Sequence, residues 1–536
     1  MLITRRSLVP AALLAAAIVA FLGFFALTAE AQTGVTETPR TNTMQVIDGE
    51  VLDSVVVGNR VIVVGTFTQV RDAGGSAINQ PYIAAYNATS GRFDGTFRPD
   101  VDDFINAIDA SGSSVFVVGQ FSNVDGEFHR RIAKINANGS VDSAFQTNVG
   151  STPNTLAVAN NKVYIGGPFT VVNDTPREAL AAVDVNSGAL DSATNFDFEF
   201  SVQAGGGLNV RWLEVSPNGS QLWASHSARF IDGANRTGIA RFDITNNTTT
   251  LNNWQTLLYD NELDRLGGAL RMRRLAVSPG GDYVVQVTSG GDRPPAGDTA
   301  VRFPTNGGAN VQPDWVSRHF DTVLGVAIND DVVFIGGHFQ FQEAPGSDDP
   351  FPGDPNTNFG FGQGQGPLAL GSQVVQREQL GALNPATGKS VDWNPGSDSF
   401  IGVQSLTWDD QLGLLVGHDG TRLGGVNNIG RHAIFPLGQT PNNGGGGNGG
   451  GGGGNGSLAC TATFDGNNAT ISFTGDRGDS LQLRRNGSWA ATVTGNSATI
   501  NANQGDTITG RVRGPNYADP FQDLSLIHIS EPTRPY

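Results

Sequence analysis

The sequence predicts an all-β protein: a seven-bladed β-propeller followed by a small β-sandwich domain. An apolar segment ending in Gly-x-Phe returns about every fifty residues, a period typical of propellers. Four short apolar segments separated by turn residues occur in each unit, as expected of four-stranded blades. The recurring motif residues are Gly65, Phe67, Gly119, Phe121, Gly167, Phe169, Gly337 and Phe339.

Residues 1–31 have the pattern of an export signal and are left out of the fold prediction. Arg5 and Arg6 precede an uncharged apolar run from Val9 to Leu27, and Ala29-Glu30-Ala31 is a small-x-small cleavage motif. An uncleaved anchor is the alternative, because about 19 apolar residues can span a bilayer. The paired arginines leave both the twin-arginine and the general export route open. We therefore predict a secreted or cell-surface protein.

Residues 32–43 are predicted to be an N-terminal linker, and residues 44–438 to form the propeller. In the second unit the run Val115–Val118 is continuously apolar, which indicates a strand buried on both faces. The seventh unit ends one strand short, after Phe435. We predict that Met44–Ile47 supplies the missing strand from the other end of the chain and so closes the ring.

The repeat itself explains most of its recurring side chains. The motif glycines are predicted to lie where a side chain would strike the neighbouring blade, or where a positive φ is needed. Aromatic residues that recur near the fourth strand are interpreted as packing between blades and not as sugar platforms. Arginines that recur before the third strand are interpreted as structural caps and not as a ligand ring. The aromatics are Phe97, Phe145, Trp254, Trp315 and Trp393, and the arginines are Arg130, Arg177, Arg236, Arg377 and Arg431.

These motifs resemble a bacterial propeller repeat, the delta-sixty repeat, which is grouped under a domain of unknown function. Its units read approximately Val-Tyr-Val-Gly-Gly-x-Phe, then Gly-x-x-Arg-x-x-Ile-Ala-Arg-x-Asn, then Gly-x-Asp-x-x-Phe. Val163–Phe169, Arg131–Asn136 and Gly139–Phe145 match these patterns, and the resemblance covers residues 44–438. It departs in the fourth and fifth units, where Val287-Thr-Ser-Gly290 lacks the Phe. The resemblance implies a propeller on an exported protein and no known reaction.

One insertion interrupts the regular repeat. Between the second and third strands of the sixth unit, residues 340–378 form a long loop rich in Pro and Gly. Phe351, Phe359 and Phe361 lie within it and are the candidate ligand-binding residues, because Phe side chains scattered along an exposed loop need a reason, and a long loop of this kind is often a binding loop. A mobile loop without a partner is the alternative.

The C-terminal part begins with a Gly-rich flexible linker, residues 439–456. Residues 457–523 contain short alternating apolar and polar segments, which predict a β-sandwich. The hairpin that ends at Trp489 resembles fibronectin type III-like or Ig-like modules. Residues 524–536 have another origin, because Leu524–Arg534 is the translation of a transposon-type sequencing adapter. We therefore expect the sandwich to be truncated and the true C-terminus to be missing.

Charge and motifs exclude several functions. The net charge of −17 argues against binding nucleic acid, which relies on Lys and Arg. The seven His lack metal-ligand spacing, and no calcium loop, phosphate-binding glycine loop or nucleophile elbow is present. We therefore predict no metal and no cofactor. The single cysteine, Cys460, rules out a disulfide within the given chain.

We predict a monomeric, non-catalytic binding or scaffold protein that uses its propeller rim to contact an extracellular protein or glycan. No membrane contact is expected after signal cleavage unless the missing C-terminus carries an anchor. Two alternatives stay open: an extracellular propeller hydrolase or lyase acting on glycans, and a structural adhesin or surface-layer module. Acidic or His side chains converging in the central channel would favour the enzyme, whereas a bare channel would favour binding.

Overall fold

The computed structural model describes residues 34–199, 207–260, 270–291, 296–347 and 373–438, and the backbone of further strands between Ala459 and His528. The chain divides into two compact units, Met1–Pro441 and Asn442–Tyr536. The signal-like segment, the Gly-rich linker and Phe351, Phe359 and Phe361 lie outside the described residues.

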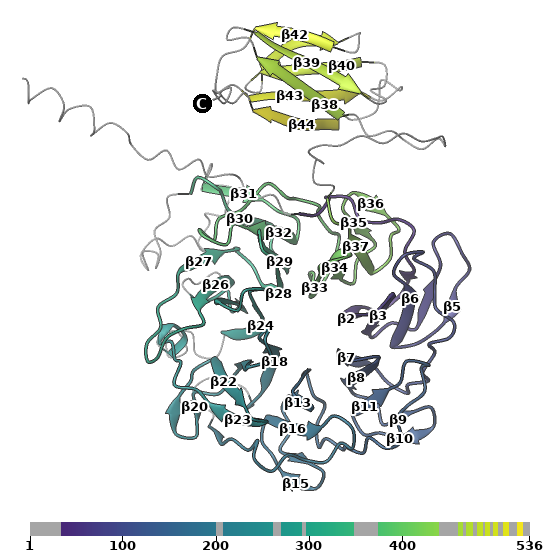
Figure 1. Cartoon of the computed structure of the whole chain (residues 1–536), viewed down its shortest axis with the longest axis vertical. Coiled ribbons are helices and arrows are strands. Elements are labelled where there is room, and N and C mark those ends of the chain that lie inside the picture. The colour runs from purple at the N-terminus through teal and green to yellow at the C-terminus, as the bar shows by residue number, and fades with distance from the viewer. Residues whose placement is uncertain are drawn as a thin grey trace, which may run out of the picture. The chain divides into compact units, whose positions relative to one another are not determined.

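The first unit is a β-propeller, in which antiparallel sheets follow one another around a central channel (Figure 1). The first strand of each sheet contacts the first strand of the next, and β33 of the last sheet contacts β2 of the first. The principal strands are, sheet by sheet, β2 (Val51–Val57), β3 (Arg60–Gly65) and β6 (Ile83–Asn87); β7 (Ile105–Ser111), β8 (Ser114–Gly119) and β11 (Ile132–Ile135); β12 (Thr155–Ala159), β13 (Lys162–Gly166) and β16 (Leu180–Asp184); β18 (Val210–Val215), β19 (Gln221–His226), β22 (Ile239–Thr245) and β23 (Thr248–Leu251); β24 (Arg271–Val277), β25 (Tyr283–Ser289), β26 (Thr299–Pro304) and β27 (Trp315–Arg318); β28 (Val323–Ile328), β29 (Val333–Gly337) and β32 (Leu380–Leu383); and β33 (Ser405–Asp409), β34 (Gly413–Gly417) and β37 (His432–Phe435).

Fourth strands are shorter than the sequence predicted. Among the described residues, only the fourth and fifth sheets have a full one, β23 and β27. In other sheets the fourth segment makes a single bridge, such as Ile135 with Val141 and Val183 with Leu190. The fourth segment of the second sheet, Val141–Phe145, is therefore anchored by one bridge and by the buried ring of Phe145.

The core lies between sheets and not within one. The second strands are buried on both faces, as predicted for Val115–Val118, because each sheet packs against a neighbour on either side. Each hydrophobic cluster joins two adjacent sheets, and the cluster that contains Val61 and Tyr86 of the first sheet also contains Leu415 and Ile434 of the last. The motif residues Phe67, Phe121, Phe169 and Phe339 are all essentially fully buried in these clusters.

Ring closure differs from the prediction for Met44–Ile47. Strand β1 (Gln45–Val46) pairs with β4 (Gln69–Arg71), which belongs to the outer hairpin after β3 and not to the last sheet. On the side of the last sheet, the amide of Arg431 donates to the carbonyl of Val46 at 2.9 Å. The pair Val46–Val70 has equivalents later in the repeat. In the same way, Val101 pairs with Val124 and Val149 pairs with Val172. Met44–Ile47 is therefore the connection into the first sheet, equivalent to the connections between later sheets.

The last sheet is instead completed by the segment predicted to be a linker. Val35 forms a β-bridge with Leu437. The amide of Thr36 donates to the carbonyl of Pro436 at 3.0 Å, and the amide of Arg40 donates to the carbonyl of Ile434 at 2.8 Å. The N-terminal segment from Val35 to Arg40 thus covers the outer edge of β37, which would otherwise be unpaired.

The motif glycines are required by close approach within their own sheet. A Cβ on Gly65 would lie 1.9 Å from the carbonyl oxygen of Glu50, and one on Gly119 would lie 2.1 Å from that of Phe104. These carbonyls belong to the chain that enters the first strand of the same sheet, so the predicted clash with the neighbouring blade is wrong for these positions. The glycine before a motif glycine is different, since a Cβ on Gly166 would lie 2.6 Å from Val210 of the next sheet.

Short outer hairpins lie beyond the second and third strands of most sheets. The loop predicted at 340–378 begins and ends in such a hairpin, so its base is a regular part of the repeat. These outer strands are β4 and β5 (Ile78–Asn79); β9 (Asn123–Val124) and β10 (Glu127–Phe128); β14 (Val171–Val172) and β15 (Thr175–Pro176); β17 (Phe198–Glu199), β20 (Phe230–Ile231) and β21 (Ala234–Asn235); β30 (Phe341–Glu343) and β31 (Val374–Gln376); and β35 (Arg422–Leu423) and β36 (Val426–Asn427).

The second unit contains two antiparallel sheets, ordered β38-β39-β42 and β41-β40-β43-β44. The strands are β38 (Ala459–Phe464), β39 (Asn468–Thr474), β40 (Ser480–Arg485), β41 (Ser488–Val493), β42 (Ser497–Asn501), β43 (Thr507–Arg513) and β44 (Gln522–His528). The strands before β44 all lie within residues 457–523, where the alternating pattern predicted short strands. Strand β44 pairs with β43 and extends past residue 523, into the segment assigned to the adapter translation.

Candidate functional site

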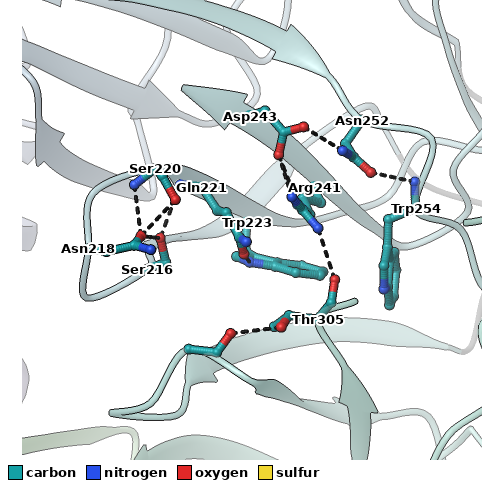
Figure 2. A network of polar contacts seen from close by, with 11 residues as sticks. Ser216, Asn218, Ser220, Gln221, Trp223, Arg241, Asp243, Asn252, Trp254 and Thr305 are labelled. Carbon is teal, nitrogen blue, oxygen red and sulfur yellow. Dashed lines mark hydrogen bonds and ion pairs between the residues drawn. The ribbon is translucent and has the colours of Figure 1, made fainter. Parts of the chain in front are cut away.

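The recurring aromatics of the fourth segments are structural. Trp254 is fully buried and packs edge-to-face on Trp223, with ring centroids 4.9 Å apart. Its indole nitrogen donates to the carbonyl of Pro304 in the next sheet at 3.0 Å. Figure 2 shows the polar network around it, in which Arg241 donates to Asp243 and to the carbonyl of Thr305. The prediction that these residues pack between sheets is confirmed for Phe97, Phe145, Trp254, Trp315 and Trp393, all of which are buried.

Two of the recurring arginines likewise hold the backbone together. Arg236 donates to the carbonyl of Asn252 at 2.7 Å, and Arg377 donates to that of Val391 at 2.9 Å. Each acceptor lies two residues before a buried Trp, so these arginines fix the fourth segments of their sheets. This supports the structural interpretation of the arginine series over the ligand ring.

The cavity in the central channel is the candidate functional site. Its volume is about 730 Å³, and the first strands β2, β7, β12, β18, β24, β28 and β33 line it. The lining extends to the turns that follow these strands, at Asn160, Pro217 and Pro279. Most first-strand positions are apolar, but Asp53, Asp109, Trp212, Glu214, Arg274 and Trp408 also line the cavity. The channel is therefore not bare.

An ion pair crosses this channel. Arg274 on β24 lies 3.4 Å from Asp53 on β2, two strands that belong to non-adjacent sheets, and also donates to the carbonyl of Leu52. The second oxygen of Asp53 accepts from the amide of Ile108 at 3.1 Å. Burial raises the pKa of Asp53 despite the opposing effect of Arg274. Because both charges have partners, the pair fixes the centre of the channel.

The Arg274 guanidinium also organises the neighbouring strand. It lies 3.8 Å from the ring centroid of Trp212, a cation–π contact. The indole nitrogen of Trp212 donates to Glu214 at 3.3 Å, which is natural because residues i and i+2 share one face of a strand. Trp212, Arg274 and Glu214 thus form one side of the cavity.

Two carboxyls of the cavity have displaced pKa values. Burial raises the pKa of Glu214 to about 8, and the nearby charges of Asp109 and Asp53 add to this effect. Burial raises the pKa of Asp109 to about 6, against the lowering effect of hydrogen bonds from the amides of Ala110 and Val158. At neutral pH, Glu214 is therefore mostly protonated and Asp109 mostly ionised. One carboxyl can donate a proton and the other can accept one.

A second tryptophan lines the cavity from the last sheet. Trp408 stacks on Phe334 with ring centroids 5.8 Å apart, and its indole nitrogen donates to Asp410 at 2.7 Å. Trp408 occupies the cavity lining together with Asp410. Aromatic faces beside carboxylate acceptors are a combination suited to polyhydroxylated ligands, since rings contact C–H faces while carboxylates accept from hydroxyls.

Sequence reasoning missed every one of these channel residues. It placed their strands correctly but singled out no side chain on them. Asp109 and Glu214 each lie four residues after the start of their strand, and Asp53 and Trp212 each lie two after. Equivalent positions of other first strands carry apolar residues, such as Ala157 and Ala159 in β12, so the repeat itself gave no signal for these side chains.

The described residues contain no group of three or more His, Cys, Asp or Glu side chains that could hold a metal ion. Within those same ranges, no helix is long and apolar enough to cross a membrane.

A family profile described as "Domain of unknown function (DUF5122) beta-propeller" matches residues 114–145. This segment covers β8 and β11 and ends at Phe145, and so contains the motifs of one repeat. No curated protein is significantly similar to this chain in sequence.

Several solved structures are similar to the chain at low identity. The computationally designed Ika8 protein is 12% identical, with 74% of this chain and 100% of that chain covered and a TM-score of 0.40. The extracellular domain of the hybrid two component system BT4673 from B. thetaiotaomicron is 13% identical, with coverage of 92% and 60% and a TM-score of 0.40. The Pseudomonas aeruginosa periplasmic gluconolactonase PpgL is 11% identical, with coverage of 74% and 97% and a TM-score of 0.36.

Proposed function

We propose that this chain is an exported, seven-bladed propeller of the delta-sixty type that binds a small carbohydrate in its central channel. One observation carries the proposal: a cavity of about 730 Å³ lined by two tryptophans and by carboxyls on separate sheets. Export follows from the signal-like segment at residues 1–31, and a monomer from the closed ring. The second unit is proposed to be a fibronectin type III-like or Ig-like sandwich that separates the propeller from a surface.

This proposal moves the binding site from the predicted rim to the channel. The rim stays an alternative, because Phe128 on β10 is 58% exposed and Phe400 is 86% exposed. Binding of neutral oligosaccharides, screened on a glycan array and measured by calorimetry, separates the two. Trp408→Ala should weaken channel binding roughly tenfold or more, as stacking contacts of one aromatic ring are worth about 0.5–1.5 kcal/mol beyond their buried area.

Phe128→Ala is the matched control, since it removes an aromatic ring from the rim. If Phe128→Ala abolished binding and Trp408→Ala did not, the site would be on the rim. If both folded variants bound as the unmodified protein does, the structural adhesin interpretation would be favoured over channel binding and over rim binding.

A second candidate function is the hydrolysis of a glycosidic bond, and the separated pKa values of Glu214 and Asp109 favour it. Glu214 would donate its proton to the leaving oxygen, while Asp109 would take a proton from the water that adds to the anomeric carbon. Activity should then be maximal between the two pKa values of about 6 and about 8. Release of reducing sugar that Glu214→Gln or Asp109→Asn abolishes would establish an enzyme; binding without product release would leave a binding protein.

A further inference from the structure

A second cavity lies where the ring closes, between the last sheet and the first. Its volume is about 950 Å³, and it is lined mainly by the turns that follow β2, β6 and β33. Strands β2 and β33 contact each other and lie side by side in the ring (Figure 1). Arg40 of the N-terminal segment and Asn42 just after it also line the cavity. The walls of this cavity, here called the seam cleft, therefore come from both ends of the propeller.

The seam cleft is open because the last sheet lacks a side chain that crosses other seams. Arg60, at the start of β3, donates to the carbonyl of Ala137 in the next sheet at 2.7 Å. Lys162, at the start of β13, reaches the carbonyl of Asn247 in its next sheet at 2.5 Å. Both residues pair with the last residue of the preceding strand, and the residue that does so in the last sheet is Gly413. No side chain therefore extends from this position into the cleft.

Arg40 supplies the missing link between the sheets from another direction. Its guanidinium donates to the carbonyl of Ala88 at 2.9 Å. Ala88 lies in the turn after β6, as Ala137 lies in the turn after β11. Arg40 thus makes the same type of contact as Arg60, but from the segment along the outer edge of β37. The last seam is tied together while the space beside Gly413 stays open.

The side chains that line the seam cleft are mostly hydrogen-bonding groups. Asn42, Asn59, Thr89, Asp410 and Gln411 all line it and are exposed. The hydroxyl of Thr89 donates to the amide oxygen of Asn59 at 3.0 Å. The side-chain amides of Asn42 and Gln411 make no hydrogen bond with the described residues, so they are available to a ligand. Each amide offers two donors and an acceptor, which suits hydroxyl groups.

The seam cleft adjoins the channel cavity at Asp410, which lines both. One oxygen of Asp410 accepts from the indole nitrogen of Trp408, the ring that lines the channel cavity, at 2.7 Å. Turns that follow first strands line both cavities, at Asn160 for the channel and at Gly58 for the cleft. The two cavities therefore open on the same face of the propeller. Each has a volume within the usual range for small-molecule sites, about 300–1,000 Å³.

We propose that the seam cleft binds the outer units of an oligosaccharide whose end occupies the channel cavity. This inference rests on the proposed carbohydrate binding in the channel and extends it. Asp410 accepts from hydroxyls where the chain leaves the channel, and the amides of Asn42 and Gln411 bind hydroxyls of the units beyond. The glycan is neutral, because Asp409 and Asp410 in the lining repel acidic sugars. Arg40, the one cation among the described lining residues, is bonded to a backbone carbonyl.

The test is a calorimetric titration of the whole chain with cello- and malto-oligosaccharides, from the disaccharide to the hexasaccharide. We expect affinity to rise with chain length until both cavities are filled. The double variant Asn42→Ala/Gln411→Ala should bind the hexasaccharide roughly tenfold more weakly, because two hydrogen bonds are lost, and the disaccharide as well as before. Asn186→Ala is the matched control. It removes an exposed amide from the turn after β16, which lines neither cavity.

Equal affinity for the disaccharide and the hexasaccharide would overturn the seam-cleft proposal and leave channel binding intact. So would a folded double variant that binds the hexasaccharide as tightly as the unmodified protein does. If no oligosaccharide bound the unmodified protein, the proposed function itself would be wrong, and this extension with it. Trp408→Ala completes the comparison: it should weaken binding at every chain length, whereas the double variant should weaken only the longer chains.

Discussion

The hydroxyl of Tyr86 lies 2.9 Å from Nε2 of His432, a hydrogen bond between residues 346 positions apart. Tyr86 is on β6 of the first sheet and His432 is on β37 of the last, and both are fully buried. Their rings also contact each other, with centroids 5.8 Å apart. A side-chain hydrogen bond therefore joins the two ends of the ring, in addition to the apolar contacts there.

Tyr86→Phe should lower the free energy of unfolding by about 1–3 kcal/mol, because it leaves Nε2 of His432 buried without its partner. Urea denaturation measures this. Tyr283→Phe is the control, since the Tyr283 hydroxyl has no hydrogen bond among the described residues, and it should change stability by less than about 0.5 kcal/mol. Equal effects of the two substitutions would contradict a specific role of the Tyr86–His432 bond.

Deletion of residues 32–41 should open the ring. It removes the segment from Val35 to Arg40, whose backbone bonds to Ile434 and Pro436 complete the last sheet. The exposed edge of β37 should lower the melting temperature and promote self-association, measured by calorimetry and light scattering. Deletion of the second unit, residues 442–536, is the control and should leave propeller unfolding unchanged. An N-terminal deletion with unaltered melting would show that the apolar cluster alone closes the ring.

Gly119→Ala should destabilise the protein by about 1–3 kcal/mol, the usual range for overpacking. The added Cβ would lie 2.1 Å from the carbonyl of Phe104, so the start of β7 has to move. The control is Gly95→Ala, where the nearest atom, in the ring of Phe93, would be 3.8 Å away. Chemical denaturation of both variants tests the assignment, and a neutral Gly119→Ala would refute it.

The sequence predicted the strands well because each repeats with its own pattern. The second strand of the second sheet, Ser114–Gly119, contains the predicted run Val115–Val118. Met44–Ile47 was misassigned because a short apolar run fits a strand or a connection equally well. Only its pairing with β4, repeated by Val101 and Val149, identifies it as a connection.

The channel site could not be predicted in the same way. Asp53 and Arg274 lie far apart in the sequence and meet only because the ring closes and brings non-adjacent sheets across the axis. A lone Asp or Glu in an apolar strand also resembles a solvent-facing residue. The raised pKa of Glu214 comes mainly from burial in the channel, and the charges of Asp109 and Asp53, which come from other sheets, add to it.

Glu214→Gln should make the protein more stable than the unmodified one at alkaline pH. The folded-state pKa of Glu214 is raised to about 8, from an ordinary value of 4.5. Between these two values the folded state binds more protons than the unfolded state, so stability falls as pH rises through this window. Gln carries no charge and is free of this loss. The stability difference should therefore be small near about pH 5 and grow towards about pH 9, measured by urea denaturation at each pH.

Glu199→Gln, on the short outer strand β17 and exposed, is the matched control and should show no such trend. A Glu214→Gln variant whose stability relative to the unmodified protein did not change with pH would show that this carboxyl titrates normally, and the acid role proposed for it would fall with that result.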